Sequence, residues 1–443
     1  MKLKQYPKYR DSGVQWIGDI PEKWEVYKLK FLLSSLQSGK RESDETAPVD
    51  EGAFSLGGEH VNWNGTLNLD HVRLLSNEYY NSMNNGKIRK NDVLLVKDGA
   101  TIGKTAIVKE MPYDKMAVNE HVFLMRPNNK INSKLLYYMI CSDSGFTQIK
   151  LTETGSAQGG INTTFPDNVL YAIPDDKSEI NPIISFLDSK TSQIEETIKK
   201  DKQLIGLLKE KRIALINHVV TKGLDKNAKM KNSGIDWIGE IPEHWSTRRI
   251  DKLSKVSRGA SPRPIDDPIY FDDEGEYSWV RIADVSSSER YLEESSEKLS
   301  VLGKSLSVAL EPGRLFVSIA GTVGKPIITK IKCCIHDGFV YFKNMKVNNE
   351  YLYYIFIGEQ AYLGLGKWGT QLNLNTETIG LITIPLPDDK EQFQIVKYLD
   401  KETSKIDQII KKIEEKITLM EEYKKSLIHH VVTGKVDVRE AVA

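Results

Sequence analysis

The chain has 443 residues, of which 40% are hydrophobic and 28% are charged, and its formal net charge at pH 7 is zero. This length suffices for two to four domains, and the zero net charge does not exclude local basic patches that would bind nucleic acid. Three cysteines in so long a chain argue against a disulfide framework. With no apolar N-terminal segment and no run long enough to span a membrane, we expect a soluble, cytoplasmic protein.

An internal repeat organises the sequence. The segment DSGVQWIGDIPEKW (11–24) recurs 221 residues later as NSGIDWIGEIPEHW (232–245). Further along, FLDSKTSQIEETIKK (186–200) recurs 212 residues later as YLDKETSKIDQIIKK (398–412). The middles of the two copies differ, which suggests one scaffold that carries two specificities.

The segment GATIGKT (99–105) resembles a phosphate-binding loop, but three residues separate its glycines where that loop needs four. The residues that follow, Ala106-Ile107-Val108, favour a strand over the helix that such a loop opens. In the second copy Pro326 replaces Thr105, so the hydroxyl that would bind magnesium is lost. We therefore predict a shared β-hairpin turn, between strands 93–96 and 106–108 in the first copy, and no ATP site.

Residues 182–222 and their copy are predicted to form two long helices. Apolar residues step alternately by four and three, which is the a/d pattern of a coiled coil. Each pattern extends over roughly 34 residues, or about 50 Å, so two helices of matched length are expected to pair. The alternative, core helices of ordinary globular domains, is disfavoured by this length. The predicted seam residues are Leu187, Ile194, Ile198, Ile205, Leu208 and Leu215 in the first helix, and Leu399, Ile406, Ile410, Ile413, Ile417, Met420 and Leu427 in the second.

Polar residues interrupt this seam at three positions, Asp201, Arg212 and Lys424. Such residues cost stability but specify the register and orientation of paired helices. They would also suit a docking face for another protein.

Taken together, these segments resemble the specificity (S) subunit of type I restriction–modification enzymes. The resemblance rests on the two WIG segments, on IPLPDDKEQFQIVKYLD before the second helix, and on the helix endings HVVTKGLD and HHVVTGKVD. It covers essentially the whole chain. It implies an α+β fold with two tandem mixed α/β target-recognition domains, separated by two long antiparallel coiled-coil helices and related by a pseudo-twofold repeat.

The resemblance also implies a division of labour. Recognition domains are expected at 1–180 and 226–392, and spacer helices within 181–225 and 393–443. Each domain would bind one half of a bipartite double-stranded DNA target, while the helices set the spacer and dock two methyltransferase (M) subunits. Restriction/translocase (R) subunits would join through that complex. S-adenosylmethionine, ATP and magnesium are expected on those partners, with no cofactor, metal or catalytic residue in this chain and no membrane partner.

Candidate DNA-binding residues follow from the chemistry of recognition. Lysine and arginine neutralise phosphates, arginine and lysine suit guanine, and glutamine and asparagine suit adenine. The candidates are Lys40, Arg41, Arg89, Lys97, Lys104 and Gln158 in the first domain, and Arg258, Arg263, Arg281, Lys325, Lys367 and Gln371 in the second.

Several candidates have a plain structural alternative. The loop SRGASPRP (257–264) carries two guanidiniums stiffened by two prolines, but it would also serve as a solvated turn. Arg290 is a further cationic candidate. Trp63, Trp279 and Trp368 could stack on DNA, although large aromatic residues more often lie in a core.

Two other functions are compatible with parts of the sequence. The first is a coiled-coil protein–protein scaffold that does not read DNA directly. Its affinity for protein partners would be insensitive to salt, whereas affinity for DNA phosphates falls steeply as salt rises. A nucleotide hydrolase using residues 99–105 would show turnover that Lys104→Ala abolishes. The short glycine spacing and the proline in the second copy disfavour the hydrolase.

The helix length gives a testable prediction. If the paired helices act as a ruler, 50 Å corresponds to roughly 15 base pairs at 3.4 Å each. Inserting one heptad within 187–219 should change the spacer between the two half-sites, or abolish binding. The measurement is selection of bound DNA from a random library, and an unchanged spacer would contradict the ruler.

Overall fold

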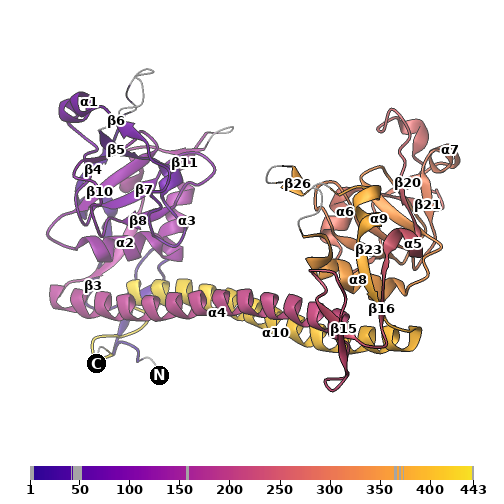
Figure 1. The fold of residues 1–443 in the computed structure, drawn as a ribbon. Helices are drawn as coiled ribbons and strands as arrows, with labels where there is room; N and C mark the ends of the chain where they lie inside the picture. Colours follow the sequence, from indigo (N-terminus) through magenta and orange to yellow (C-terminus); the bar gives the residue numbers. More distant parts are fainter. Residues whose placement is uncertain are drawn as a thin grey trace. The chain divides into compact units, whose positions relative to one another are not determined.

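The computed structural model describes residues 4–40, 42, 52–155, 159–363 and 374–441, together with the backbone of 367, 368, 371 and 372. Within it the chain divides into two compact units (Figure 1). Unit 1 comprises residues 1–201 and 415–443, and unit 2 comprises residues 202–414. Each unit combines a mixed α/β domain with part of both long helices. In the described part of the chain, no helix is long and apolar enough to cross a membrane.

Unit 1 is built on two small sheets that pack face to face. The four-stranded sheet is antiparallel, and in the three-stranded sheet β5 and β9 run parallel. Phe54 and Val118 from the smaller sheet share one core with Leu94 and Leu124 from the larger. The strands, in sheet order, are β4 (Leu33–Ser38), β10 (Val122–Pro127), β7 (Val93–Val96) and β8 (Thr105–Ile107), then β6 (Leu74–Leu75), β5 (Ala53–Leu56) and β9 (Met116–Val118).

Short strand pairs and helices complete unit 1. The pairs are β1 (Tyr9–Asp11) with β2 (Asp19–Pro21), β3 (Trp24–Lys28) with β13 (Leu170–Pro174), and β11 (Glu153–Thr154) with β12 (Gly160–Ile161). The helices are α1 (Asn77–Ser82), α2 (Ser133–Cys141), α3 (Asp143–Leu151) and the first half of α4 (Ile180–Lys222), with 3-10 turns at Leu29–Phe31, Gly58–His60, Phe165–Asp167 and Lys177–Glu179.

Unit 2 has a larger version of the same plan. Its two sheets enclose Phe316, Phe339 and Ile335 in one core. The five-stranded sheet is β17 (Lys255–Arg258), β25 (Phe339–Lys343), β22 (Leu315–Ser318), β23 (Pro326–Thr329) and β19 (Tyr291–Leu292), and the four-stranded sheet is β20 (Glu297–Leu299), β18 (Tyr277–Val280), β24 (Cys333–Ile335) and β21 (Val308–Leu310).

The remaining elements of unit 2 are again short pairs and helices. The pairs are β14 (Met230–Asn232) with β15 (Glu240–Pro242), β16 (Ser246–Arg249) with β28 (Thr383–Leu386), and β26 (Lys367–Trp368) with β27 (Gln371–Leu372). The helices are α5 (Ile250–Leu253), α6 (Ile282–Ser287), α7 (Val301–Ser305), α8 (Asn349–Ile357), α9 (Thr376–Leu381) and the first part of α10 (Asp389–Val432), with 3-10 turns at Pro268–Tyr270 and Gln360–Tyr362.

The P-loop-like segment forms a strand–turn–strand, as predicted from its spacing. β7 and β8 are antiparallel, and β8 begins one residue earlier than expected. Gly103 has a φ of +94°, and a Cβ there would lie 2.5 Å from the ring of Phe146. In unit 2 Gly324 has a φ of +88° and meets the ring of Tyr362 in the same way. The repeated glycine therefore serves a tight turn beneath an aromatic ring.

The start of α10 and the ends of both long helices lie at sequence signals. Asp388 accepts a hydrogen bond from the backbone N–H of Glu391 (2.8 Å), which caps the start of α10. Gly223 and Gly434 follow the ends of α4 and α10 with φ of +74° and +71°, a conformation that favours glycine at a helix C-terminus.

Opposite charges join the two long helices at the three polar seam positions. In unit 1 the Asp201 carboxylate lies 2.8 Å from Lys416 Nζ, and Lys424 pairs with Glu195. In unit 2 Arg212 Nε lies 3.0 Å from the Asp407 carboxylate. Every predicted seam residue is buried or half-buried: Leu187, Ile194, Ile198, Leu399, Ile406, Ile410, Ile417 and Leu427 are buried, and Ile205, Leu208, Leu215, Ile413 and Met420 are half-buried.

A tyrosine–aspartate–threonine contact fastens each α/β domain to a long helix. In unit 1 the hydroxyl of Tyr138 on α2 lies 2.7 Å from Asp188 Oδ1 and 3.3 Å from Thr191 Oγ1, both on α4. We call this contact, and its counterpart in unit 2, the helix clamp. Because the aspartate and threonine lie one turn apart on the helix, one hydroxyl reaches both.

The helix clamp of unit 2 uses Tyr354 of α8 with Asp400 (2.7 Å) and Thr403 (3.5 Å) of α10. It carries an additional cation, because Arg290 binds both Asp400 and Glu350. The Arg290 guanidinium also lies 5.0 Å from the Tyr354 ring centroid. Burial alone would lower the pKa of Arg290, but its bond to Asp400 and the charge of Glu350 outweigh burial and raise the pKa.

The end of the chain seats on its beginning within unit 1. Gly434 packs against Pro21 and Trp24, and Lys435 Nζ donates to the carbonyl of Asp19. Arg439 pairs with Glu179 at 3.6 Å. The last residues of α10 and the C-terminal tail therefore complete the same unit as the first strands.

The helix clamp gives a prediction on stability. Arg290→Leu leaves Asp400 and Glu350 without their cation, and should cost roughly 2–4 kcal/mol of unfolding free energy, less than for a fully buried pair because both acids are partly exposed. Tyr354→Phe should cost about 1 kcal/mol. The midpoint of urea unfolding measures both, with Tyr398→Phe on an exposed position of α10 as the control. Equal midpoints for the two Tyr→Phe variants would contradict the role of the clamp.

Candidate nucleic-acid interface

The hairpin turn of unit 1 presents two of the predicted lysines. Lys97 is half-buried, with its Nζ 3.2 Å from Asp98 Oδ2, and Asp98 Oδ1 lies 2.6 Å from His121 Nδ1. Lys104 Nζ lies 6.0 Å from the ring centroid of Trp63, which is 62% exposed. An exposed aromatic ring beside a cation suits a nucleic-acid surface, where rings stack on bases and cations meet phosphates.

Two of the other four candidates of unit 1 are described by the structure, and both are exposed. Lys40 follows β4 and is exposed, and Arg89 is exposed with its backbone N–H bonded to Asp92 Oδ2 (2.7 Å). Arg41 and Gln158 lie outside the described residues. The exposed lysine and arginine are thus available to phosphates, as a DNA-binding role requires.

The predicted arginine loop of unit 2 converges on one acidic residue, Asp337. Arg258 Nε donates to the backbone carbonyl of Asp337, and an Arg263 terminal nitrogen lies 3.0 Å from Asp337 Oδ2. Ser261 Oγ donates to Asp337 Oδ1 at 3.0 Å. Partial burial opposes ionisation of Asp337, but the Ser261 bond and the charges of both arginines outweigh it and lower the pKa of this carboxyl. The carboxylate therefore stays ionised at neutral pH.

The remaining cations of unit 2 are engaged by protein groups. Arg281 Nε lies 2.6 Å from Glu297, and this hydrogen bond raises the pKa of Arg281. Lys325 Nζ donates to the carbonyl of Ser286 (3.0 Å), and burial lowers the pKa of Lys325. Arg290 belongs to the helix clamp. These contacts favour structural roles, because a cation already paired gains less from a phosphate.

The aromatic and amide candidates of unit 2 are either buried or have side chains that lie outside the described residues. Trp279 is fully buried in the core of the four-stranded sheet. Lys367 and Gln371 lie on β26 and β27, but their side chains, like that of Trp368, are outside the described residues. Of the two candidate tryptophan side chains that the structure describes, Trp63 is the exposed one, and its exposure favours stacking.

A large groove in unit 2 is unsuited to DNA. It encloses about 1780 Å³ between the segment around Arg290, α8 and the two long helices, and seven carboxylates line it against four cations. Three of those acids, Glu289, Glu293 and Glu294, are exposed. Excess negative charge repels phosphates, so we place the interface on the arginine loop rather than in this groove.

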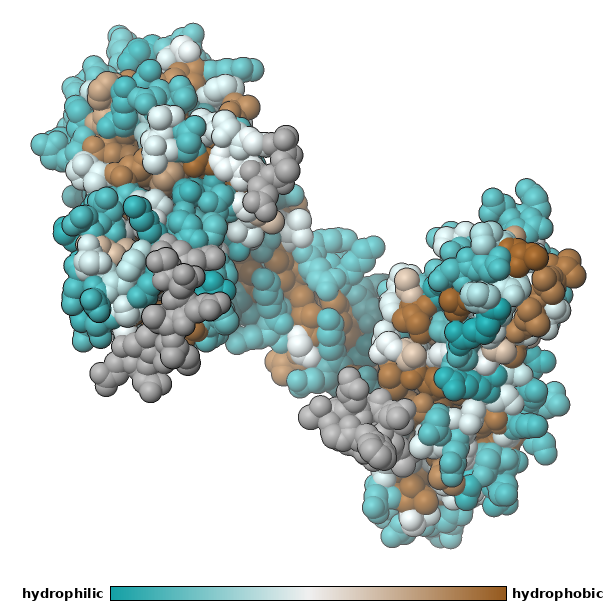
Figure 2. All heavy atoms as spheres, turned by 90° about the horizontal axis from the view of Figure 1, so that it is seen from above, coloured by the Kyte–Doolittle hydropathy of each residue, from teal (hydrophilic) through white to brown (hydrophobic). Residues whose placement is uncertain are grey.

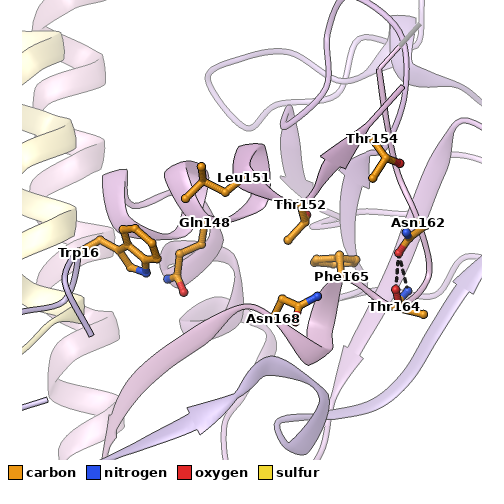
Figure 3. A pocket seen from close by; sticks show the side chains of 9 residues that line it. All are labelled: Trp16, Gln148, Leu151, Thr152, Thr154, Asn162, Thr164, Phe165 and Asn168. Atoms are coloured by element: carbon orange, nitrogen blue, oxygen red, sulfur yellow. Dashed lines mark hydrogen bonds between the residues drawn. The ribbon is translucent and has the colours of Figure 1, made fainter. Parts of the chain in front are cut away.

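A smaller pocket in unit 1 also lacks the groups for phosphate or metal chemistry. It measures about 350 Å³ and lies beside α3 (Figure 3). Amide and hydroxyl side chains, including Asn162 hydrogen-bonded to Thr164, surround the ring of Phe165. Among the residues that the structure describes, no group of three His, Cys, Asp or Glu side chains is placed to hold a metal ion.

Sequence reasoning missed the acidic residues that hold the candidate cations. Asp337 and Asp98 carry no pattern of their own, and the bond from Arg263 to Asp337 spans 74 residues. Trp63 was identified as a candidate, but its exposure needed the structure. A search for acids in the turn before the strand that pairs with the strand of the basic loop would have found Asp337, because Asp337 precedes β25 and β25 pairs with β17.

Comparisons with known proteins identify relatives over most of the chain. A family model described as the type I restriction modification DNA specificity domain matches residues 21–202 and again residues 242–419. The putative type I restriction enzyme MjaX specificity subunit of Methanocaldococcus jannaschii is 25% identical over 450 residues, covering 99% of each chain. The two segments matched by the family model together span most of the chain.

Solved structures share the fold at low sequence identity. A chain from a study of complex assembly and conformational transition of the type I R-M system has a TM-score of 0.72 at 14% identity, over 94% of this chain and 99% of that one. The HsdS subunit from Thermoanaerobacter tengcongensis has a TM-score of 0.54 at 15% identity, over 94% and 98%.

Contacts of the candidate cations predict unequal effects on DNA binding. Lys104→Ala should weaken binding and reduce the slope of log affinity against log salt by about one, because one phosphate contact is lost. Arg281→Ala should leave that slope unchanged and lower the unfolding midpoint, because Glu297 loses its partner. Affinity measured over a salt series tests both, and equal slopes for the two variants would contradict the assignment.

Proposed function

The chain belongs to the type I restriction–modification DNA specificity family, and we propose that each of its two units reads one half of a bipartite DNA target. It is a DNA sequence-specificity subunit, whose partners are DNA and the modification and restriction subunits of such a system. One observation carries the two-half proposal: each of the two family matches coincides with a basic loop of its own, at Lys97–Lys104 in unit 1 and Arg258–Arg263 in unit 2.

The proposed DNA contacts follow the state of each side chain. The exposed Lys40 and Arg89 and the half-buried Lys104 would bind phosphates in one half-site. Arg258 and Arg263 would reach base edges in the other, because arginine reads guanine through two parallel hydrogen bonds. The aromatic ring of Trp63 would add stacking or sugar contacts beside Lys104.

We propose that the long helices form an antiparallel coiled coil that sets the spacer, with a pseudo-twofold relation between the two halves of the chain. The ion pairs of Asp201 with Lys416 and of Arg212 with Asp407 support an antiparallel pairing. The residue with the higher number on α4 pairs with the residue with the lower number on α10. On this basis the recognition domains would occupy about 1–180 and 226–392. The spacer helices would be α4 (Ile180–Lys222) and α10 (Asp389–Val432), each of which begins slightly before the predicted bounds of 181 and 393.

The helices also offer a surface for the methyltransferase subunits. Leu207 and Ile409 in unit 2 are 62% and 47% exposed, and Leu419 and Tyr423 in unit 1 are 65% and 56% exposed. Figure 2 shows hydrophobic residues on the surface of the long helices. Large apolar side chains on an exposed helix mark a protein-binding surface. One such surface in each unit supports two methyltransferase subunits per chain.

The chemistry is assigned to the partners. Specificity subunits are non-catalytic, so we propose that this chain has no activity of its own and holds no cofactor. S-adenosylmethionine would be bound by the methyltransferase subunits, and ATP and magnesium by restriction subunits that join through the complex. The task of modifying and cutting intracellular DNA would place the complex in the cytoplasm.

The test is recovery of the tagged chain from its host, followed by sequencing of the DNA bound by the recovered complex. We expect methyltransferase subunits and DNA that shares a split motif, with affinity that falls steeply as salt rises. Methyltransferase subunits without sequence-selective DNA would contradict the reading role. Salt-insensitive binding of other proteins alone would favour the scaffold alternative.

A further inference from the structure

Asp337 stands at the centre of the arginine loop, yet it cannot itself contact phosphate favourably. It lies between β24 and β25, while Arg258 ends β17 and Arg263 follows in the next turn. Its backbone carbonyl and both carboxylate oxygens are used by Arg258, Arg263 and Ser261. Asp337 binds Arg258 through its backbone carbonyl and Arg263 through its carboxylate. An acidic residue within a proposed DNA-binding loop needs an explanation, because its charge reduces the attraction of both arginines for DNA.

Geometry supplies that explanation for Arg258. Its bond to the Asp337 carbonyl uses Nε, so the two terminal nitrogens remain for a ligand. Those nitrogens form the end of the guanidinium fork, which is the part that reaches O6 and N7 of guanine. The bond therefore fixes the direction of the fork without occupying it.

Arg263 is held in a different way. One terminal nitrogen binds Asp337 Oδ2, and its side chain is 67% exposed while that of Asp337 is 38% exposed. The hydroxyl of Tyr270 donates to the Arg263 carbonyl (3.0 Å), which restrains the backbone of the loop as well. Holding a flexible arginine in place before binding removes part of the entropy cost of ordering it on DNA.

Resting on the proposed function, we propose that Asp337 is a specificity-determining positioning residue, which aims Arg258 and Arg263 at G·C pairs in the half-site read by unit 2. The negative charge of Asp337 lowers the affinity for DNA of any sequence. In return, a guanidinium held in one direction discriminates against a wrong base that a mobile cation would tolerate. Guanine is the base that this loop selects, since arginine pairs with its two major-groove acceptors.

The experiment uses the chain in complex with its methyltransferase subunits and compares Asp337→Asn with the unaltered chain. In this variant the negative charge is lost, so the ion pair with Arg263 is broken while the side chain keeps its size. The bond of Arg258 to the backbone carbonyl of residue 337 remains. We expect discrimination at the G·C pair read by Arg263 to fall about tenfold, and discrimination at the pair read by Arg258 to persist. Binding to random DNA should be unchanged or slightly tighter, because a negative charge is lost.

Two further variants separate positioning from folding. Asp273→Asn removes the same charge at an exposed position of unit 2 and should leave discrimination intact. Arg263→Lys keeps its charge and loses the fork, so it should lose discrimination at the same base pair as Asp337→Asn. The double variant Asp337→Asn/Arg263→Lys should lose little more discrimination than either single variant, because both substitutions disrupt the same contact.

Several outcomes would overturn the inference. Unchanged discrimination in Asp337→Asn would do so, as would losses that multiply in the double variant. Equal weakening on every sequence together with a lower unfolding midpoint would make Asp337 a structural residue only. Failure of the proposed function itself would look different, because the unaltered complex would then select no sequence.

Discussion

The helix clamp is the contact on which the rest of the structure depends. Tyr138 in unit 1 and Tyr354 in unit 2 each bind an aspartate and a threonine one turn apart on a long helix. A recognition loop reads DNA usefully only if its domain is held at one place on the helix. The clamp meets that requirement with hydrogen bonds that are directional, where apolar packing alone would let the domain slide.

Charge pairing separates the cations that build the fold from those that face a ligand. Arg290 is paired with two carboxylates, and Arg281 is paired with the carboxylate of Glu297. Lys104, in contrast, lies beside an exposed aromatic ring. Arg258 and Arg263 fall between these classes, since one acidic residue engages both. A neutral net charge is thus compatible with DNA recognition, because acids neutralise the structural cations and leave the loops basic.

Local sequence patterns predicted the helices and the hairpin, but they could not predict contacts between residues that are distant in the sequence. The seam over both long helices, the strand–turn–strand around Gly103, and the polar seam residue Asp201 were all readable, because each depends on neighbours within a few turns or strands. The partner of Asp201, Lys416, and the acid behind the arginine loop, Asp337, lie too far away in sequence for any spacing rule. Exposure of Trp63 likewise depended on packing that a single sequence does not encode locally.

The seating of the chain's end on its beginning affects the order in which the protein can form. Unit 2 is one continuous stretch, residues 202–414, whereas unit 1 also needs residues 415–443. Domains that emerge first from the ribosome generally fold first. Here the later unit has all its residues while the earlier one still waits for Gly434 and Arg439. The N-terminal half is therefore the last to mature during synthesis, and a nascent chain interrupted near its end would display a finished unit 2 beside an unfinished unit 1.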